Sequence, residues 1–175
     1  MIRAYIGLGS NLGDRRGNLE RAISLLGCRP EIRLLRASSL YETEPMEVAG
    51  GRFFNAVLEV ETSLAPQELL ETLSQVEEAC GRARVRERGE ARSADMDLLL
   101  YASQVIPGSN LEVPHPRMHL RRFVLAPLSE LDPDLVHPGL GIRVGDLLTR
   151  LPPVPEVRVV ARDWLRAGVL ETCSS

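Results

Sequence analysis

The chain has 175 residues, a formal net charge of −3 and 26% charged residues, which together indicate one globular domain. All 21 basic residues are arginine, and this excludes a lysine-containing phosphate loop, a Schiff-base lysine and a lysine general base. The negative net charge argues against a general nucleic-acid binder, so charge must act locally. We therefore expect a single domain that binds small molecules and no nucleic acid.

The cysteines and the hydropathy pattern set the expected compartment. Cys28, Cys80 and Cys173 are scattered and form no CxxC pair, so neither a disulfide framework nor a cysteine zinc site is expected. No segment approaches the run of about 18 apolar residues that a membrane helix needs. We expect a cytoplasmic protein without a membrane partner, present as a monomer or a weak homodimer.

The first third of the chain alternates strand and helix patterns. Residues 3–8 predict a strand, residues 9–14 a glycine-containing turn, and residues 18–26 a helix with apolar positions at helical spacing. Residues 32–41 predict a second strand. Residues 53–62 predict a third strand, which could pair with the second in a hairpin.

Helix signals dominate the rest of the chain. Ser63 is the expected cap of a helix that contains Pro66 in its first turn and ends at Gly81. Further helices are expected over residues 122–131 and 144–151. The element order is typical of an α+β sandwich of the ferredoxin-like kind, with an antiparallel or mixed sheet and helices on one face.

The C-terminal residues lie outside this pattern. We expect a domain over residues 1–151 and a C-terminal extension of unknown role over residues 152–175. Within the extension, residues 157–161 could add an edge strand and residues 163–170 a short helix. A loose tail is the alternative interpretation.

Two carboxylates begin the strand that follows the arginine-rich segment. Because side chains alternate along a strand, Asp95 and Asp97 should point the same way and Met96 into the core. Like charges on one face repel, so a cationic partner is expected beside them. The nearest cations in the sequence are Arg82, Arg84, Arg86, Arg88 and Arg92.

These charges allow two interpretations. The arginines could pair directly with Asp95 and Asp97 as a solvated surface network. Alternatively, the aspartates could hold Mg²⁺ while the arginines bind the polyphosphate that the metal bridges. Glu77, near the end of the preceding helix, is more often an arginine's structural partner than a catalytic residue.

A histidine-rich stretch follows the acidic strand. His115 and His119 have the spacing of a zinc pair on a helix, but Pro114 and Pro116 make a helix improbable there. His115 and Arg121 are therefore expected to donate to phosphate oxygens opposite the aspartates. His137 is interpreted as an ordinary loop residue.

Four segments together resemble a known enzyme family. They are Gly-Ser-Asn-Leu-Gly over residues 9–13, Phe-Phe-Asn-Ala over residues 53–56, Arg-Ser-Ala-Asp-Met-Asp over residues 92–97, and Val-Pro-His-Pro-Arg-Met over residues 113–118 with Arg121 and Phe123. This combination is similar to 6-hydroxymethyl-7,8-dihydropterin pyrophosphokinase of folate biosynthesis. The resemblance implies a ferredoxin-like fold, ATP with two Mg²⁺ ions, and transfer of pyrophosphate to the pterin hydroxymethyl group with release of AMP.

The resemblance also implies roles for particular residues. Asp95 and Asp97 would ligate both metal ions. The residues expected at ATP are Arg82, Arg88, Arg92, His115, Arg121 and Glu77, and those expected at the pterin are Thr43, Pro45, Met46, Phe53, Asn55 and Phe123. A flat heteroaromatic ring suits two aromatic faces, and an amide can both donate to and accept from its edge.

Two other functions remain as alternatives. A Mg²⁺-dependent nucleotidyl transferase could use the same aspartate pair, but it would release pyrophosphate and not AMP. An arginine-rich RNA-binding module on a ferredoxin-like scaffold would need exposed sheet aromatics that this sequence lacks, and it assigns no role to Asp95 and Asp97.

Overall fold

A central antiparallel sheet organises the computed structural model, which describes residues 1–44, 51–81, 93–165 and 169. The strands occur in the order β5-β1-β4-β3-β8, and β2 pairs with β4 beside β3. Among the described residues, every strand pairing in this sheet is antiparallel. The sheet strands are β1 (Ile2–Ser10), β2 (Ile32–Ala37), β3 (Leu40–Thr43), β4 (Phe53–Thr62), β5 (Asp95–Tyr101) and β8 (Val157–Ala161).

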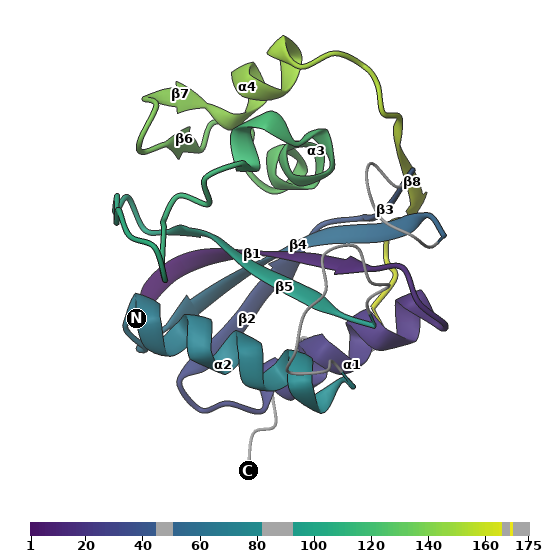
Figure 1. Cartoon of the computed structure of the whole chain (residues 1–175), viewed down its shortest axis with the longest axis vertical. Helices are drawn as coiled ribbons and strands as arrows, with labels where there is room; N and C mark the ends of the chain where they lie inside the picture. Colours follow the sequence, from purple (N-terminus) through teal and green to yellow (C-terminus); the bar gives the residue numbers. More distant parts are fainter. Residues whose placement is uncertain (45–50, 82–92, 166–168, 170–175) are drawn as a thin grey trace.

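Helices cover both faces of the sheet (Figure 1). The helices are α1 (Arg15–Gly27), α2 (Pro66–Ala79), α3 (Arg122–Leu131), α4 (Val144–Arg150) and the short 3₁₀ helix η1 (Met118–Leu120). One core packs α1 and α2 beneath the sheet, and a second packs α3 and α4 above it. The α+β prediction is confirmed, whereas the prediction of helices on one face only is wrong. A small hairpin of β6 (Val136–His137) and β7 (Ile142–Arg143) adjoins α4.

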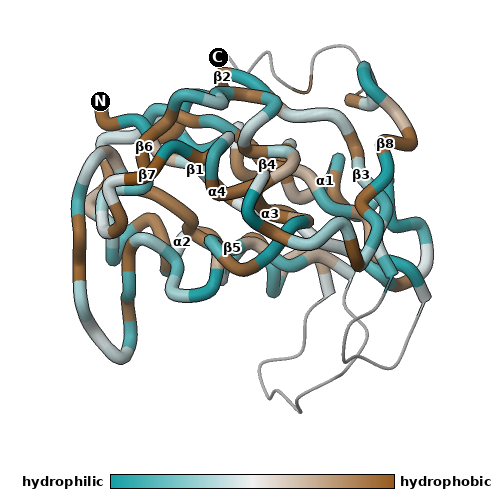
Figure 2. Tube along the Cα trace, turned by 90° about the horizontal axis from the view of Figure 1, so that it is seen from above, coloured by the Kyte–Doolittle hydropathy of each residue, from teal (hydrophilic) through white to brown (hydrophobic). Residues whose placement is uncertain are grey.

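The sheet face toward α3 carries the features that matter for function. Viewed from above, α3 lies over the sheet and its trace alternates between polar and apolar positions (Figure 2). Its apolar side packs on Tyr5, Val57 and Leu99. Side chains alternate along a strand, so on each of these strands the residues two and four positions away share this face. Toward the end of the sheet that α3 does not cover, these positions are open for function.

The predicted strand over residues 32–41 is two strands in the structure. Strand β2 pairs with the second half of β4, and β3 pairs with its first half. Ser38 and Ser39 separate the two strands. The Ser38 Oγ accepts a hydrogen bond from the Val57 N–H at 2.9 Å, and the Ser39 hydroxyl donates to Glu130 at 2.8 Å. Side-chain hydrogen bonds of this kind compete with the strand ladder, and they interrupt it here.

The start of α2 also differs from the prediction. Ala65, not Ser63, is the N-cap residue, and its N–H donates to Glu68 Oε2 at 2.8 Å. Pro66 occupies the first helical position as expected. The Glu68 carboxylate therefore accepts from the N–H of the N-cap residue, and the prediction that Ser63 caps the helix is wrong.

The C-terminal segment is attached to the sheet through β8, which pairs with β3 as the predicted edge strand. Trp164 follows and is 1% exposed, and its indole N–H donates to the Ser38 carbonyl at 2.8 Å. The Arg16 guanidinium also donates to the Trp164 carbonyl oxygen. Residues 163–165 form no helix, so the predicted helix does not begin at residue 163, because this turn inserts Trp164 into the core.

The described helices are short. None of them is long and apolar enough to cross a membrane. Of the cysteines, Cys28 is exposed and Cys80 is buried, and both are free thiols.

Candidate active site

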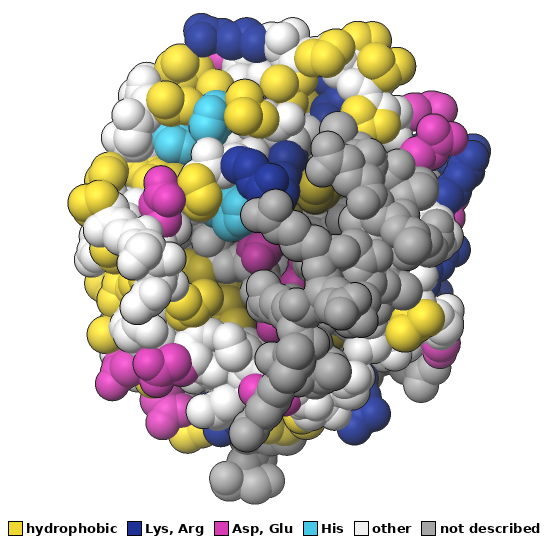
Figure 3. All heavy atoms as spheres, in the orientation of Figure 1, with side chains coloured by type: hydrophobic (Ala, Val, Ile, Leu, Met, Phe, Trp, Pro, Cys, Tyr) yellow, Lys and Arg dark blue, Asp and Glu magenta, His cyan; other side chains and the backbone are white. Residues whose placement is uncertain are grey.

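The acidic pair lies at the beginning of edge strand β5. Asp95 and Asp97 are half-buried on the face toward α3, whereas Met96 between them is 4% exposed and packs in the opposite core. The predicted alternation is therefore confirmed. Figure 3 shows arginine and histidine side chains beside acidic ones on this side of the molecule.

Three strands bring Asp95 into line with a predicted pterin residue. Gly9 on β1 pairs with Asn55 on β4 and with Asp95 on β5. One row further along, Gly7 pairs with Val57 and with Asp97. Directly paired residues share a face, so the amide and the carboxylates project from one surface with only glycine between them.

The carboxylate of Glu77 approaches β5 from the side of α2. Glu77 is 4% exposed, and its Oε1 accepts a hydrogen bond from the Met96 N–H at 2.7 Å. The outward-facing N–H groups of an edge strand have no strand partner, so a side-chain acceptor can fill this role. Glu77 thereby holds the backbone between Asp95 and Asp97.

His115 lies in the segment that crosses above β5. Its backbone N–H donates to the Leu99 carbonyl at 2.9 Å, which attaches the segment to the strand. Its Nδ1 accepts from the Arg117 N–H at 3.2 Å, so the neutral ring carries its proton on Nε2. Burial, followed by Arg121 and Arg117, lowers the His115 pKa to about 4. His115 is thus a neutral donor, and Asp95 is near enough to influence its charge.

Arg121 and Phe123 mark the start of α3. The Arg121 guanidinium carbon lies 5.6 Å from the centre of the Phe123 ring, within cation–π range. Phe123 is half-buried, and Arg121 is the N-cap residue of the helix. The helix start therefore presents a cation and an aromatic face together.

Thr43 and Asn55 meet across β3 and β4. The Asn55 amide Nδ2 donates to Thr43 Oγ1 at 2.8 Å, and the side chains of both residues are buried. Thr43 also pairs directly with Phe53, which is half-buried. This bond orients the Asn55 amide, so its Oδ1 faces the backbone of Gly9.

Part of the predicted site lies outside the described residues. These are the ATP-site residues Arg82, Arg88 and Arg92, and the pterin-site residues Pro45 and Met46. The described candidates are arranged on one side of the sheet: Thr43, Phe53 and Asn55 on β3 and β4, Asp95 and Asp97 on β5, and His115, Arg121 and Phe123 above them.

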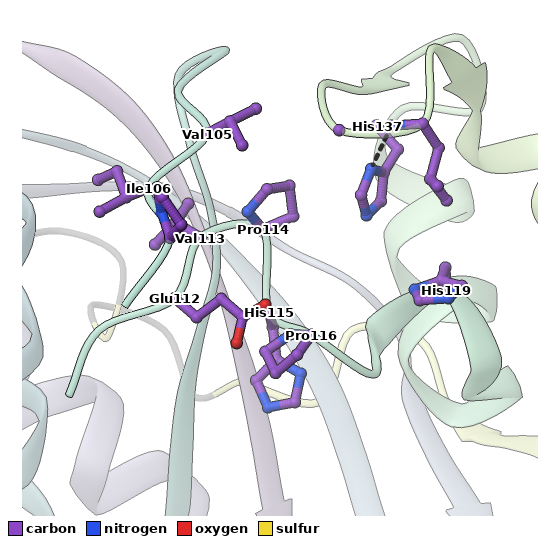
Figure 4. Close-up of a pocket in the computed structure, with 12 residues that line it drawn as sticks. Val105, Ile106, Glu112, Val113, Pro114, His115, Pro116, His119 and His137 are labelled. Atoms are coloured by element: carbon purple, nitrogen blue, oxygen red, sulfur yellow. Dashed lines mark hydrogen bonds between the residues drawn. The ribbon is translucent and has the colours of Figure 1, made fainter. Parts of the chain in front are cut away.

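A pocket is lined in part by His115. Its walls include Ile106 and Pro114, and His119 and His137 lie together across from them (Figure 4). The prediction that His137 is an ordinary loop residue is wrong, because it ends β6 and is 5% exposed. The Leu140 N–H donates to its Nδ1 at 3.2 Å, and its ring packs edge-on at 5.9 Å from His119. Burial and then His119 lower the His137 pKa.

The sequence interpretation assigned no role of its own to Gly9, and it did not predict the contact that Glu77 makes with β5. Gly9 was part of a motif but was interpreted only as a turn, whereas it pairs within the sheet between Asn55 and Asp95. Glu77 was expected near the nucleotide, and the bond to Met96 gives it a defined contact with the acidic strand. In the sequence, only the position of Gly9 at the end of an alternating strand could have indicated its place.

One side of the sheet thus carries an acidic strand end, a neutral histidine donor, an arginine, an oriented amide and two aromatic rings. Carboxylates that can hold a metal ion, close to donors for phosphate oxygens, are typical of the class of enzymes that transfer phosphoryl groups. More particularly, residues 5–133 match the model of the 7,8-dihydro-6-hydroxymethylpterin-pyrophosphokinase (HPPK) family. The chain belongs to this family.

Individual relatives agree with the family assignment. The chain is 46% identical over 129 residues to 2-amino-4-hydroxy-6-hydroxymethyldihydropteridine pyrophosphokinase of Bacillus subtilis, covering 73% of this chain and 77% of the relative. It is 40% identical over 140 residues to the enzyme of the same name from Haemophilus influenzae, covering 79% and 87%.

Solved structures support the fold. The chain superposes on wild-type HPPK-DHPS of Plasmodium falciparum with a TM-score of 0.68 and 14% sequence identity. The match covers 85% of this chain and 44% of that chain, so this chain spans less than half of that longer protein. The predicted ferredoxin-like fold is confirmed.

Proposed function

We propose that this chain transfers pyrophosphate from ATP to the hydroxyl group of 6-hydroxymethyl-7,8-dihydropterin and releases AMP, as an ATP-dependent pyrophosphokinase of folate biosynthesis. Membership of the HPPK family supports this reaction. The observation that carries it is the row Asn55–Gly9–Asp95, because it joins a group that can recognise a pterin edge to a carboxylate that can hold a metal ion.

The acidic residues fit magnesium. Mg²⁺ is commonly bound through one or two carboxylates, with substrate phosphates and water completing its octahedron. Asp95 and Asp97 supply such a pair, and carboxylate oxygens suit Mg²⁺ better than a soft metal ion. We therefore assign Asp95 and Asp97 as the ligands of two Mg²⁺ ions, which would neutralise the phosphate charge and polarise the reacting oxygens.

The protein's own groups position the two substrates. The pterin lies between the Phe53 and Phe123 rings, with its polar edge at Asn55 and Thr43. Its hydroxyl attacks the β-phosphorus of ATP in line, the bond from that phosphorus to the α-phosphate oxygen breaks, and AMP leaves. No side chain is assigned as a general base.

Histidine and arginine donors stabilise the phosphates during transfer. Neutral His115 donates from Nε2, because the Arg117 N–H occupies Nδ1. Arg121 contributes a fixed positive charge, and Arg82, Arg88 and Arg92 are assigned the remaining phosphate contacts. Donors held in place before the reaction stabilise the transition state without reorganisation.

Product analysis tests the reaction. The protein is incubated with ATP, Mg²⁺ and the hydroxymethyl-dihydropterin, and AMP and pyrophosphate are quantified beside Asp97→Ala and the control Asp163→Ala, which changes an exposed aspartate. We expect pterin-dependent AMP from wild type and the control, and almost none from Asp97→Ala. Release of pyrophosphate without AMP would identify a nucleotidyl transferase instead.

A further inference from the structure

We propose that Gly9 is a positioning residue that keeps open the path between the pterin side and the metal side of the site, so that the reacting hydroxymethyl group lies directly over its backbone. This inference rests on the proposed function and names where the acceptor alcohol meets the phosphates. The acceptor substrate of the enzyme is accordingly a flat heteroaromatic ring that carries an unhindered primary alcohol.

The sheet register places Gly9 at the centre of the site. Its pairing partners are Asn55 on one side and Asp95 on the other, and all three residues share the face toward α3. Neighbouring strands lie about 4.8 Å apart, so two strand spacings separate the recognition group from the carboxylate. A hydroxymethyl group extending from the pterin ring has to cross this interval.

The surroundings of Gly9 consist of site residues. A Cβ atom built on Gly9 would lie 3.5 Å from Asn55 Oδ1, 3.9 Å from the Asp95 Cβ and 3.9 Å from Phe53 Cδ1. Each of these residues has a proposed role in substrate or metal binding. A methyl group at this position would therefore occupy the space between the two halves of the site.

Glycine is not required here by the backbone or by packing in the free protein. The φ angle of Gly9 is outside the left-handed region, and the three distances are ordinary van der Waals contacts. Alanine can therefore adopt this strand position without strain. The remaining reason for glycine is the space that it leaves for substrate.

Gly7 shows the contrast on the same strand and face. A Cβ atom at Gly7 would lie 3.3 Å from Leu99 Cδ2, and its three nearest neighbours are all atoms of that core side chain. Leu99 thus covers Gly7, so glycine at this position serves packing. The same residue type therefore has different roles two positions apart.

The test compares Gly9→Ala and Gly9→Val with the wild type and with Gly7→Ala. Pterin affinity is measured by fluorescence titration in the presence of a non-hydrolysable ATP analogue, ATP affinity by calorimetry, and the melting temperature by circular dichroism. For Gly9→Ala we expect pterin affinity and kcat/KM to fall by about tenfold or more, since one misplaced methyl group has effects of this size. ATP affinity should remain within about twofold and the melting temperature should not fall, because alanine reduces the entropy of the unfolded chain.

The control Gly7→Ala and the series Gly9→Ala and Gly9→Val distinguish a loss of space for the substrate from a loss of protein stability. Gly7→Ala should lower the melting temperature while leaving pterin affinity within about twofold. Gly9→Val should reduce pterin affinity further than Gly9→Ala. Unchanged pterin affinity and turnover in Gly9→Ala would overturn the inference, as would equal losses of pterin and ATP affinity.

The failure of the proposed function gives a different result. If the wild type forms no pterin-dependent AMP but still binds pterin, the proposed reaction fails and the Gly9 variants still decide where the pterin lies. If the wild type does not bind pterin, both proposals are wrong.

Discussion

Glu77 Oε1 accepts a hydrogen bond from the Met96 N–H at 2.7 Å, so a buried carboxylate on α2 holds the backbone between the two aspartates of β5. Glu77 is 4% exposed, so this contact lies inside the protein. Outer residues that orient metal ligands commonly change metal affinity when they are replaced. This contact therefore links a helix beneath the sheet to the chemistry above it.

Replacement of Glu77 tests that link. Glu77→Ala should raise the Mg²⁺ concentration that gives half-maximal AMP formation by about tenfold, because the Met96 N–H loses its acceptor and the aspartate strand loosens. Glu77→Gln retains a carbonyl acceptor and should lie between Glu77→Ala and wild type. A Mg²⁺ titration of initial rates measures both variants.

The control for this experiment is Glu71→Gln, which changes an exposed glutamate of the same helix. It should have the Mg²⁺ requirement of the wild type. If Glu77→Ala lowered thermal stability but left the Mg²⁺ dependence unchanged, Glu77 would have a structural role alone.

The bond between Asn55 and Thr43 predicts a pterin-specific defect. Thr43→Val keeps the shape of the side chain but removes the oxygen that accepts from the Asn55 amide, so the amide loses its fixed orientation. A buried donor without its partner is destabilised by about 1–3 kcal/mol, and we expect pterin affinity to fall about tenfold. Fluorescence titration with the pterin measures this loss.

ATP binding provides the internal reference for Thr43→Val and should remain unchanged. Thr72→Val is the matched surface control, since the Thr72 hydroxyl bonds only within α2. Equal weakening of ATP and pterin binding would indicate that the whole site had shifted.

The low pKa of His115 predicts the pH dependence of stability. The imidazole has a pKa of about 4 in the folded protein and 6.5 as its ordinary value, because burial and then Arg121 and Arg117 oppose its protonation. Between these two values the unfolded chain binds more protons at this residue, so its contribution to the free energy of unfolding falls as the pH decreases from 6.5 to 4. Urea unfolding at several pH values should show this loss, and His115→Gln should reduce it.

A direct titration complements the stability measurement. In NMR spectra of the free protein, the His115 ring signals should titrate near pH 4 and remain those of the neutral form at pH 7. A midpoint near 6.5 would contradict the lowering of the His115 pKa by burial and by the neighbouring arginines. An ATP analogue should raise the midpoint, because phosphate stabilises the charged ring.

Trp164 predicts that the C-terminal segment contributes to global stability. The indole is 1% exposed and donates to the Ser38 carbonyl, so Trp164→Ala removes a large core side chain and a hydrogen bond. We expect a loss of about 3–5 kcal/mol in the free energy of unfolding, measured by urea denaturation. Trp164→Phe should lose less, because it keeps most of the apolar volume.

Val154→Ala is the control for Trp164, because Val154 is 68% exposed and lies in the same C-terminal segment. Its unfolding curve should match that of the wild type. A wild-type curve for Trp164→Ala would show that residues 157–164 are not part of the cooperative unit.

Local patterns in the sequence determined much of the fold and the identity of the family. The alternation around Met96 placed Asp95 and Asp97 on one face, because strand side chains repeat every two residues whatever the strand pairs with. The bounds of β4 and the starts of α3 and α4 also follow from local hydrophobic periodicity and were predicted correctly. Within each motif segment of this family the residues lie close together in the chain, so the motifs were recognisable without the fold.

Only the tertiary structure decided which of these residues meet. Asn55, Gly9 and Asp95 come from three distant segments, and their common row depends on the register of long-range strand pairs, which no local pattern specifies. The contact of Glu77 with Met96 and the burial of Trp164 against Ser38 have the same origin. The local sequence determines which side chains are present, whereas the packing of the whole chain determines the distances between them and therefore the site.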